Sequence, residues 1–339
     1  MKKLSWFNKV VFGFNIVVTV LTFIAYVLPF LAPKLFPLLS VLTLILPLFL
    51  ILNALFFIYW LLQLKRQVML SGLVLLLGIT FINKFYKFSS NDLPEEEKDF
   101  TVMSYNVRLF NLFDWLPNDH IGDTILSFIN EQNPDILCIQ EYSENAKVDL
   151  RIYKYKAVFM EGKQIKTGQA IFSKFPIFNK GDFKIPEAGN NIIYADIKKG
   201  KDTIRVYNIH LQSIKISPDV NEIEEHVDAI DKNKSQQVFG RIREAFKKQE
   251  QQAAILVNHK KECKYPVIIC GDMNNSAFSY IYRNIKGDLN DCFEEAGNGF
   301  GQTYKFKYYP ARIDYIFANK SMKVKSFKSF SKFENSDHF

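Results

Sequence analysis

Apolar and polar positions divide the chain into an apolar N-terminal part and a longer remainder in which short apolar runs alternate with polar turns. Three apolar stretches come first, at residues 10–31, 36–62 and 68–82, and they have almost no polar face. A helix that crosses the hydrocarbon core of a bilayer needs about 20 apolar residues, which the third stretch reaches only if it extends to Phe85. The pattern predicts three transmembrane helices that form a membrane anchor over residues 1–87.

Positive charges beside these stretches predict the orientation of the anchor. Five lie on one side of the predicted spans (Lys2, Lys3, Lys9, Lys65 and Arg66) and three on the other (Lys34, Lys84 and Lys87). Because the more positive side stays in the cytoplasm, three crossings place the rest of the chain outside it. Lys2 and Lys3 also suit the start of a cleaved signal peptide. No A-x-A site follows, however, and two further apolar stretches do, which favours an anchor.

A polar, acidic stretch with a proline at residues 88–99 is the predicted linker to a domain at 100–339. Within that domain, runs of β-forming residues occur at 100–107, 136–140, 169–173, 192–197, 204–211, 267–270, 313–317 and 324–330. Helical patterns occur at 121–132, 235–260 and 279–285. Many strands with few helices predict an α/β domain with mixed sheets.

Charge and cysteine usage add little to this picture. The formal net charge is +8, but the positive residues are scattered and fit a solvated surface. The densest basic segment, at 232–261, includes Lys234, Arg241, Arg243, Lys247 and Lys248. Either it binds phosphates of a nucleic acid or it is an exposed amphipathic helix. The four cysteines form no CxxC pair, and Cys138 and Cys270 lie in apolar runs typical of buried positions.

Polar residues that suit a metal or a phosphate follow several of the predicted strands. They are the carboxylates Glu141, Asp272, Asp314 and Asp337, the amides Asn106 and Asn274, and the histidines His210 and His338. Strand ends at one rim of a sheet can converge on one pocket. Oxygen ligands without a thiolate favour magnesium, manganese or calcium over structural zinc. Taken singly, each residue also fits a turn or a helix cap, so the prediction rests on the ordered set.

That set resembles the endonuclease/exonuclease/phosphatase family, whose fold is like that of deoxyribonuclease I. The motifs are SYNVR at 104–108, PDILCIQE at 134–141, NIHL at 208–211, GDMNN at 271–275, RIDYIF at 312–317 and SDH at 336–338. With the apolar N-terminal part, the chain looks like the membrane-attached bacterial type of the family. That resemblance implies a bacterial inner membrane, with the domain on the non-cytoplasmic side.

The resemblance implies a four-layered α/β sandwich, two packed mixed sheets flanked by helices, and a role for each motif residue. Glu141 would be the main ligand of Mg²⁺ or Mn²⁺, assisted by Asn106 and Asp337. His338 would be the general base or fix the attacking water, and Asp314 would orient it. Asp272 would position or activate that water, which leaves the choice of base open. Asn274 and His210 would donate to the phosphate.

Family members also continue after the SDH motif with an apolar strand, whereas the sequence stops at Phe339. Either the sequence is truncated or that strand is absent, and its absence would expose a sheet edge beside His338. The expected function is divalent-metal-dependent hydrolysis of phosphate esters, first as a phosphodiesterase or nuclease. A phospholipid or inositol-phosphate phosphoesterase is the alternative, since an anchor holds the site near a lipid bilayer. A membrane receptor or scaffold that has lost catalysis is the non-enzyme alternative.

Overall fold

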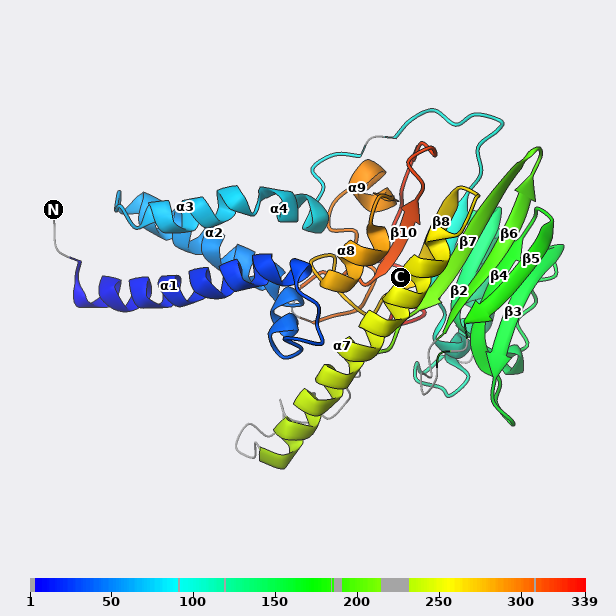
Figure 1. Cartoon of the computed structure of the whole chain (residues 1–339), viewed down its shortest axis with the longest axis horizontal. Coiled ribbons are helices and arrows are strands. Elements are labelled where there is room, and N and C mark those ends of the chain that lie inside the picture. The colour runs from blue at the N-terminus through cyan, green and yellow to red at the C-terminus, as the bar shows by residue number, and fades with distance from the viewer. Residues whose placement is uncertain are drawn as a thin grey trace. The chain divides into compact units, whose positions relative to one another are not determined.

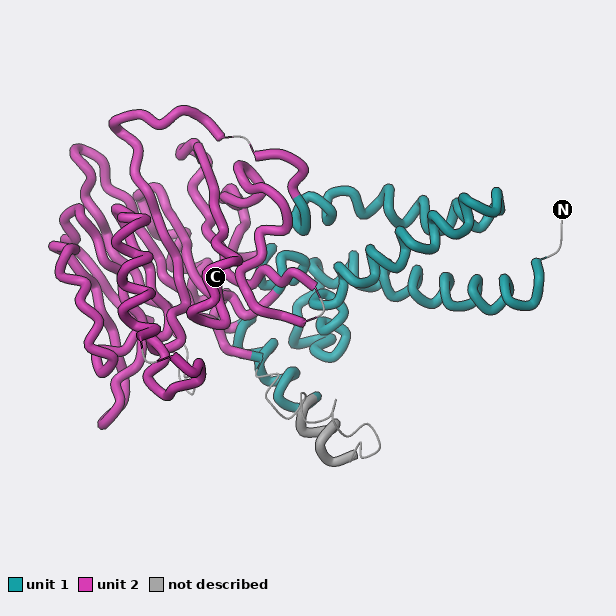
Figure 2. The backbone as a smooth tube through the Cα atoms, turned by 180° about the vertical axis from the view of Figure 1, so that it is seen from behind, with its two compact units in different colours: residues 1–86, 214–250, 276–283 teal, residues 87–213, 251–275, 284–339 magenta. Residues whose placement is uncertain are grey.

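The computed structural model describes residues 4–90, 92–118, 120–183, 185, 191–214, 232–307 and 309–339, with the side chains of 232–238 left out. The chain forms two compact units (Figure 2). The first comprises residues 1–86, 214–250 and 276–283, and the second comprises 87–213, 251–275 and 284–339. The first unit thus joins the N-terminal residues to two later segments of the chain.

The first unit is helical. Its N-terminal elements are α1 (Trp6–Val27), the 3-10 turns Leu28–Phe30 and Leu39–Thr43, α2 (Leu46–Leu62), α3 (Val68–Leu77) and α4 (Ile79–Phe85). The later segments pack within the same unit, since Ser276 Oγ donates to the Thr43 carbonyl at 2.9 Å. Phe278 also joins the core cluster that contains Leu46 and Val74. Helix α7 (Lys232–Lys261) begins in this unit and ends in the second.

The prediction of three transmembrane helices is wrong as stated. Among the described residues, one helical stretch, Trp6–Phe30, is long and apolar enough to cross a membrane, a test that signal sequences also pass. The second predicted span folds as a 3-10 turn and then α2, which has only 17 residues and starts with Pro47 near its N-terminus. The third bends by 64° between α3 and α4, at Gly78. Counting apolar residues could not reveal these two breaks.

The N-terminal helices turn polar residues inward and apolar ones outward. Asn15 Nδ2 donates to Ser71 Oγ at 2.9 Å, and Trp60 Nε1 donates to Asn15 Oδ1 at 3.0 Å. Asn53 Nδ2 donates to Thr22 Oγ1 at 3.0 Å, and these polar side chains are buried. The outer faces carry exposed apolar side chains, among them Phe14, Val17, Leu55, Leu73 and Leu76. Exposed apolar side chains therefore surround an interior that holds both apolar side chains and hydrogen-bonded polar ones.

The second unit contains two mixed sheets flanked by helices (Figure 1). The four-stranded sheet has the order β1-β2-β4-β3, formed by Val102–Asn106, Ile136–Tyr142, Thr167–Ser173 and Tyr155–Glu161. The six-stranded sheet has the order β5-β6-β7-β8-β10-β9. Its strands are Ile177–Phe183, Ile192–Lys199, Asp202–His210, Val267–Asp272, Asp314–Ala318 and Asn290–Asp291. Only β1–β2 and β7–β8 pair in parallel among the named strands.

Strand alternation explains how the layers pack. On β2, Ile136 and Cys138 enter an apolar cluster with Ile193, Val206 and Ile268 of the six-stranded sheet. The intervening residues of β2 point to the other face, where they meet helix α5 (Ile121–Gln132). Alternate residues of a strand point to opposite faces, so one strand serves both layers. The expected α/β sandwich of two mixed sheets is therefore present.

Most predicted elements occur, with two kinds of error. The segment at 324–330, predicted as a strand, forms none. Its Phe327 and Phe330 rings instead pack on Phe293 and Phe128, at centroid distances of 5.8 and 5.0 Å. Conversely, β3 and β5 were not predicted. Alternation of apolar and charged residues marks a half-buried segment, but it does not say whether a neighbouring strand exists to pair with it.

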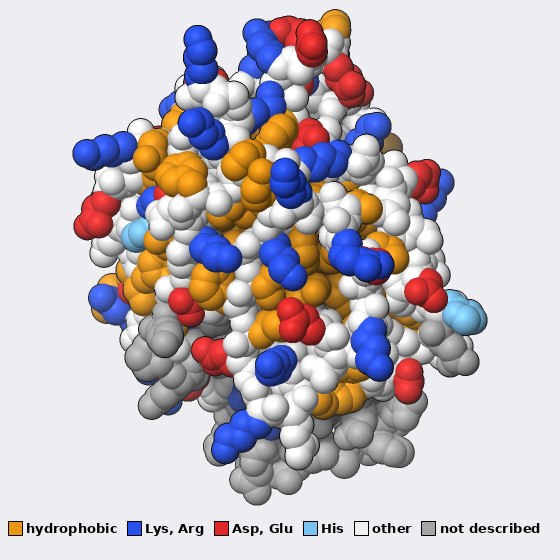
Figure 3. Space-filling view, turned by 90° about the vertical axis from the view of Figure 1, so that its right-hand side faces the viewer, with side chains coloured by type: hydrophobic (Ala, Val, Ile, Leu, Met, Phe, Trp, Pro, Cys, Tyr) orange, Lys and Arg blue, Asp and Glu red, His pale blue; other side chains and the backbone are white. Residues whose placement is uncertain are grey.

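The predicted linker contacts the second unit instead of running free. Lys87 N donates to the Gly299 carbonyl at 2.8 Å, and Leu93 N donates to the Lys325 carbonyl at 2.8 Å. The Lys325 ammonium lies 2.8 Å from carboxylates of both Glu96 and Asp99. On the face of the molecule seen in Figure 3, lysine and arginine side chains are spread among acidic and apolar ones. This spread agrees with the scattered charge in the sequence.

Candidate active site

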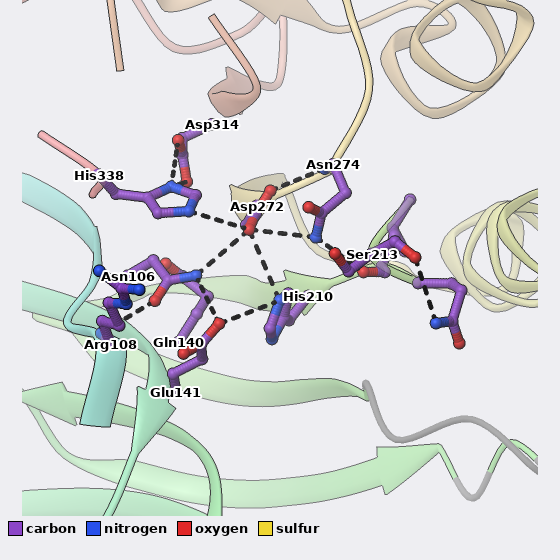
Figure 4. Close-up of polar contacts among 12 residues, drawn as sticks. Asn106, Arg108, Gln140, Glu141, His210, Ser213, Asp272, Asn274, Asp314 and His338 are labelled. Atoms are coloured by element: carbon purple, nitrogen blue, oxygen red, sulfur yellow. Dashed lines mark hydrogen bonds and ion pairs between the residues drawn. The ribbon is translucent and has the colours of Figure 1, made fainter. Parts of the chain in front are cut away.

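Five strands of the second unit bring Asn106, Glu141, His210, Asp272 and Asp314 to one end of the two sheets (Figure 4). Asn106 ends β1, and Asp272 ends β8. In the six-stranded sheet, Asp272 is the direct register partner of both His210 on parallel β7 and Asp314 on antiparallel β10. The end of β8 therefore meets the start of β10. Residues far apart in sequence converge because of this register.

Glu141 reaches the site through an irregularity in β2. The register between β2 and β4 shifts between Ile139 and Tyr142, and Glu141 has a left-handed φ of 51°. A bulge re-aims a side chain that strict alternation would send to another face. A non-glycine residue in this conformation is strained, and such strain concentrates at functional sites. The Glu141 side chain is 34% exposed, so it lies at the solvent-facing edge of the group.

The buried Asn106 amide joins two of the carboxylates. Its Nδ2 lies 3.3 Å from Glu141 Oε1 and 3.2 Å from Asp272 Oδ2, while its Oδ1 accepts from Arg108 N at 3.1 Å. The nitrogen, rather than the oxygen, thus faces the two carboxylates. To offer its oxygen to a cation held by Glu141, the amide must turn over and give up the Arg108 contact.

Asp272 is the most buried carboxylate of the site, at 1% exposure. Burial, followed by the nearby charge of Asp314, raises the pKa of Asp272 to about 8. Just before it, Gly271 has a φ of 129°, and a Cβ there would stand 2.0 Å from the Ile209 carbonyl oxygen. Glycine is therefore required for β8 to approach β7 closely enough to place Asp272.

His338 lies between two carboxylates. Its Nδ1 is 2.9 Å from Asp314 Oδ2, and its Nε2 is 3.7 Å from Asp272 Oδ2. Burial pulls the pKa of the His338 imidazole down, but Asp314 and Asp272 outweigh it and raise that pKa to about 10. Asp314 is itself held by Thr303, whose Oγ1 accepts from the Asp314 backbone N–H at 3.1 Å. Sequence pattern did not single out Thr303.

His210 faces the same carboxylates from β7. Its Nε2 lies 3.5 Å from Asp272 Oδ2 and 3.8 Å from Glu141 Oε1. Burial lowers the pKa of His210, against the opposing effect of Glu141, so the imidazole is favoured in its neutral form. Asn274, with a φ of 48°, folds back so that its backbone N–H donates to Asp272 Oδ1 at 2.7 Å.

Asp337 is placed differently from the other predicted metal ligands. Its Oδ2 lies 3.7 Å from Arg108 Nε, and its Oδ1 accepts from Ser336 Oγ at 3.3 Å. Asn106 and Glu141 are in contact, but no contact described for Asp337 joins it to either of them. Ser336 ties this end of the chain to the site, since its Oγ also donates to the Asn106 carbonyl at 2.9 Å.

Several further residues support the site and were not assigned a role from sequence. Gln140 Nε2 on β2 donates to Asn208 Oδ1 on β7 at 2.5 Å, and Asn208 Nδ2 donates to the Ile139 carbonyl at 2.8 Å. This buried link fastens the two sheets directly beneath Glu141 and His210. Both amides lie inside the motifs at 134–141 and 208–211, but the sequence did not indicate that they pair with each other. Tyr304 packs edge-on against the His338 ring, with the centroids 5.1 Å apart.

The part of the chain that forms this site matches the model of a known protein family. The model of the Endonuclease/Exonuclease/phosphatase family matches residues 103–338. The chain belongs to this family. Members of this family are phosphoesterase hydrolases, and they generally use divalent metal ions. The preceding segment, residues 8–85, matches a domain of unknown function (DUF8431). No curated protein compared with the chain matches it.

Solved structures of similar shape come from bacteria and from animals. An endonuclease/exonuclease/phosphatase family protein from Leptotrichia buccalis is 19% identical, with a TM-score of 0.49, and the match covers 71% of this chain and 96% of that one. A mannosyl-6-phosphatase from Bacteroides thetaiotaomicron is 21% identical, with a TM-score of 0.48, over 71% and 97%. The human Nocturnin catalytic domain with bound sulfate is 17% identical, with a TM-score of 0.46, over 70% and 90%.

The donor set of the site fits a hard divalent cation. Glu141, Asp272 and Asp314 supply carboxylate oxygens, and no cysteine lies among the contacts described above. Among the described residues, Asp272, Asp314 and His338 form one group whose possible ligand atoms lie within 4.8 Å of one another. Magnesium keeps several waters and needs only one or two protein carboxylates, so the carboxylates of this site are enough to hold it. The second possible group is Glu141 with Asn106.

Proposed function

We propose that the chain hydrolyses phosphate esters with the help of a bound Mg²⁺ or Mn²⁺ ion, and that its substrates are phosphodiesters. The observation that carries the proposal is the convergence of Asn106, Glu141, His210, Asp272 and His338 at one end of the two sheets. Glu141 and Asn106 are the proposed cation ligands. Asp337 remains the predicted third ligand. To bind the ion, its carboxylate would have to give up its contact with the Arg108 guanidinium. When bound, the ion neutralises phosphate oxygens and stabilises the leaving alkoxide.

The remaining site residues handle the water and the phosphate. Asp314 holds His338 through Nδ1, which leaves Nε2 facing Asp272. Either Asp272 or His338 takes the proton of the attacking water, as the sequence motifs imply. Asn274 and His210 donate to oxygens of the scissile phosphate. A donor must carry its proton at the site, and the neutral imidazole of His210 keeps one N–H for this purpose.

Turnover of generic substrates tests this function. Purified protein should hydrolyse bis-p-nitrophenyl phosphate in Mg²⁺ or Mn²⁺, and the rate on the diester should exceed that on p-nitrophenyl phosphate. A higher rate on the monoester would instead indicate that the protein is a phosphatase and not a phosphodiesterase. No turnover of either compound, or of nucleic acids and phosphoinositides, would favour a non-catalytic receptor or scaffold. A phospholipid or inositol-phosphate phosphoesterase is the second candidate, which the first unit motivates.

We also propose that the first unit is held in a lipid bilayer. Its helices bury hydrogen-bonded polar side chains such as Asn15 and Asn53 and expose apolar ones such as Leu55 and Leu73. Helices in membranes associate through such polar contacts, whereas large exposed apolar surfaces are rare on soluble monomers. The predicted placement of the catalytic unit on the non-cytoplasmic side needs an odd number of crossings from a cytoplasmic N-terminus, which Trp6–Phe30, the one unbroken candidate span among the described residues, would supply.

A further inference from the structure

The loop after β1 is an unusual piece of backbone close to the candidate site. Four successive residues, Arg108 to Asn111, have left-handed φ values of 45°, 53°, 54° and 61°. Residues other than glycine visit this region singly as a rule, because Cβ crowds the following carbonyl. A run of four is therefore costly and persists only where the surroundings determine it.

Two anchors hold this loop in place. Asn111 Nδ2 donates to the Leu116 carbonyl at 2.9 Å, and Asn111 Oδ1 accepts from the Leu116 N–H at 2.9 Å. The Phe110 ring is buried and meets Tyr142 edge-on, with centroids 5.9 Å apart. These contacts fix the residues between them, so the loop is a preformed surface.

The loop presents two aromatic rings and a guanidinium to solvent. Trp115 is 42% exposed and Phe113 is 49% exposed, and their ring centroids lie 5.2 Å apart. The Arg108 guanidinium lies over the Trp115 ring, 4.8 Å from its centroid. Large rings are normally buried, so two of them side by side on a strained loop need an explanation other than packing.

Arg108 connects this surface to the candidate site. Its backbone N–H donates to Asn106 Oδ1, and its Nε lies 3.7 Å from a carboxylate oxygen of Asp337. That ion pair is longer than a hydrogen bond, and a guanidinium carries five N–H donors. The Arg108 side chain is also 33% exposed, so it can offer donors to a ligand that lies next to Asn106.

We propose that Arg108 and Trp115 form a subsite for the nucleotide that flanks the scissile phosphate of a single-stranded nucleic acid. A base stacks on the exposed part of the Trp115 ring, and the flanking phosphate pairs with the Arg108 guanidinium. Stacking on an aromatic ring tolerates every base, and arginine binds phosphate through parallel N–H groups. The proposal rests on the phosphodiesterase function proposed above and names its substrate class.

Substrates with and without a flanking nucleotide test the subsite. In Trp115→Ala and in Arg108→Gln, the ratio of kcat/KM for a short single-stranded oligothymidylate to kcat/KM for bis-p-nitrophenyl phosphate should fall about 10- to 100-fold. Phe178→Ala removes a comparably exposed ring from β5, and it should leave the ratio and both rates unchanged. An unchanged ratio in the two loop variants would overturn the subsite. If the two loop variants lose activity on phosphoinositide vesicles but not on oligothymidylate, relative to bis-p-nitrophenyl phosphate, the subsite would be overturned in favour of one for a lipid head group.

Binding provides a readout that does not depend on turnover. The chain has three tryptophans, and Trp115 is the one in the second unit. Oligothymidylate added in the presence of EDTA should quench the part of the tryptophan fluorescence that comes from Trp115. The same addition should cause no such quenching in Trp115→Phe. Quenching without cleavage would retain the subsite and reject the proposed catalysis. Cleavage without Trp115-dependent quenching would support the proposed catalysis and reject the subsite.

Discussion

The Asp314 carboxylate and the His338 imidazole meet through Nδ1, at 2.9 and 3.1 Å, although 24 residues separate them in the chain. The contact requires two separate elements: β10, which starts at Asp314, and the terminal segment, which is held by the pairing of His338 with Tyr304. Such a contact fixes which ring nitrogen carries the proton and stabilises the imidazolium.

Asp314 and His338 should therefore act as one unit. We expect His338→Ala to lower kcat/KM by roughly 100- to 10,000-fold, the usual range for a positioned acid or base. The double variant with Asp314→Asn should be barely worse than His338→Ala alone, because either change disables the same step. The measurement is kcat/KM for bis-p-nitrophenyl phosphate at a fixed concentration of metal. Losses that multiply would show that the two residues work separately.

Removal of the metal or of its main ligand should abolish turnover. EDTA should stop hydrolysis by the wild type, and added Mg²⁺ or Mn²⁺ should restore it. Glu141→Gln keeps the shape of the side chain but removes its charge, so we expect activity to fall by at least 100-fold and to need much more metal. Titration of activity against metal concentration measures both effects. Full activity in excess EDTA would rule out the metal mechanism.

The sequence predicted the end points of the strands better than the details at those points. Asn106 and Asp272 lie where apolar runs end, so periodicity alone located them. It could not show that Glu141 lies on a bulge, because a left-handed residue changes the direction of a side chain without changing the pattern. The left-handed run after Val107 was missed for the same reason.

Long-range pairing was the other limit. Nothing local in the sequence links Gln140 to Asn208, yet that hydrogen bond joins the two sheets. The apolar N-terminal segment shows a second limit, which concerns backbone geometry. Its composition predicted three membrane helices, but the length of α2 and the bend at Gly78 depend on backbone geometry that composition does not contain.

A buried ion pair beside the site should make a large contribution to stability. Arg312 Nη1 lies 2.8 Å from Asp291 Oδ2, and the two side chains are 5% and 1% exposed. Arg312→Met removes the cation that faces the buried Asp291 carboxylate, so the free energy of unfolding should fall by about 3–5 kcal/mol. Adding Asp291→Asn should recover part of that loss, since Asn can still cap helix α9 (Cys292–Ala296). Urea unfolding measures both, and Arg151→Met, at an exposed pair, is the control.

His259 should make stability depend on pH. Burial, followed by the charge of Arg205, lowers the pKa of His259, whose Nδ1 lies 2.8 Å from the Tyr207 hydroxyl. The pKa of His259 in the folded state is below its unfolded value of about 6.5. The neutral His259 imidazole therefore contributes its full stabilisation above about pH 6.5, and this stabilisation is lost as the pH falls through the folded-state pKa. Between about pH 8 and pH 5, the wild type should lose more stability than His259→Gln. Equal losses would contradict this, and His120→Gln, at an exposed histidine, is the matched control.

The outward apolar faces of the first unit should govern its partitioning into membranes. Leu55, on α2, and Leu73, on α3, are 57% and 50% exposed. A lysine in the centre of a membrane helix costs about 2.5–3.5 kcal/mol, so Leu55→Lys or Leu73→Lys should release protein from a membrane pellet that resists high salt. Phe178→Lys, at an exposed site of the second unit, should not.

A reporter fusion tests the orientation of the catalytic unit. An alkaline phosphatase fused after residue 87 should be active, because a single crossing by Trp6–Phe30 from a cytoplasmic N-terminus carries it outside. An inactive but stable fusion would show that the catalytic unit faces the cytoplasm.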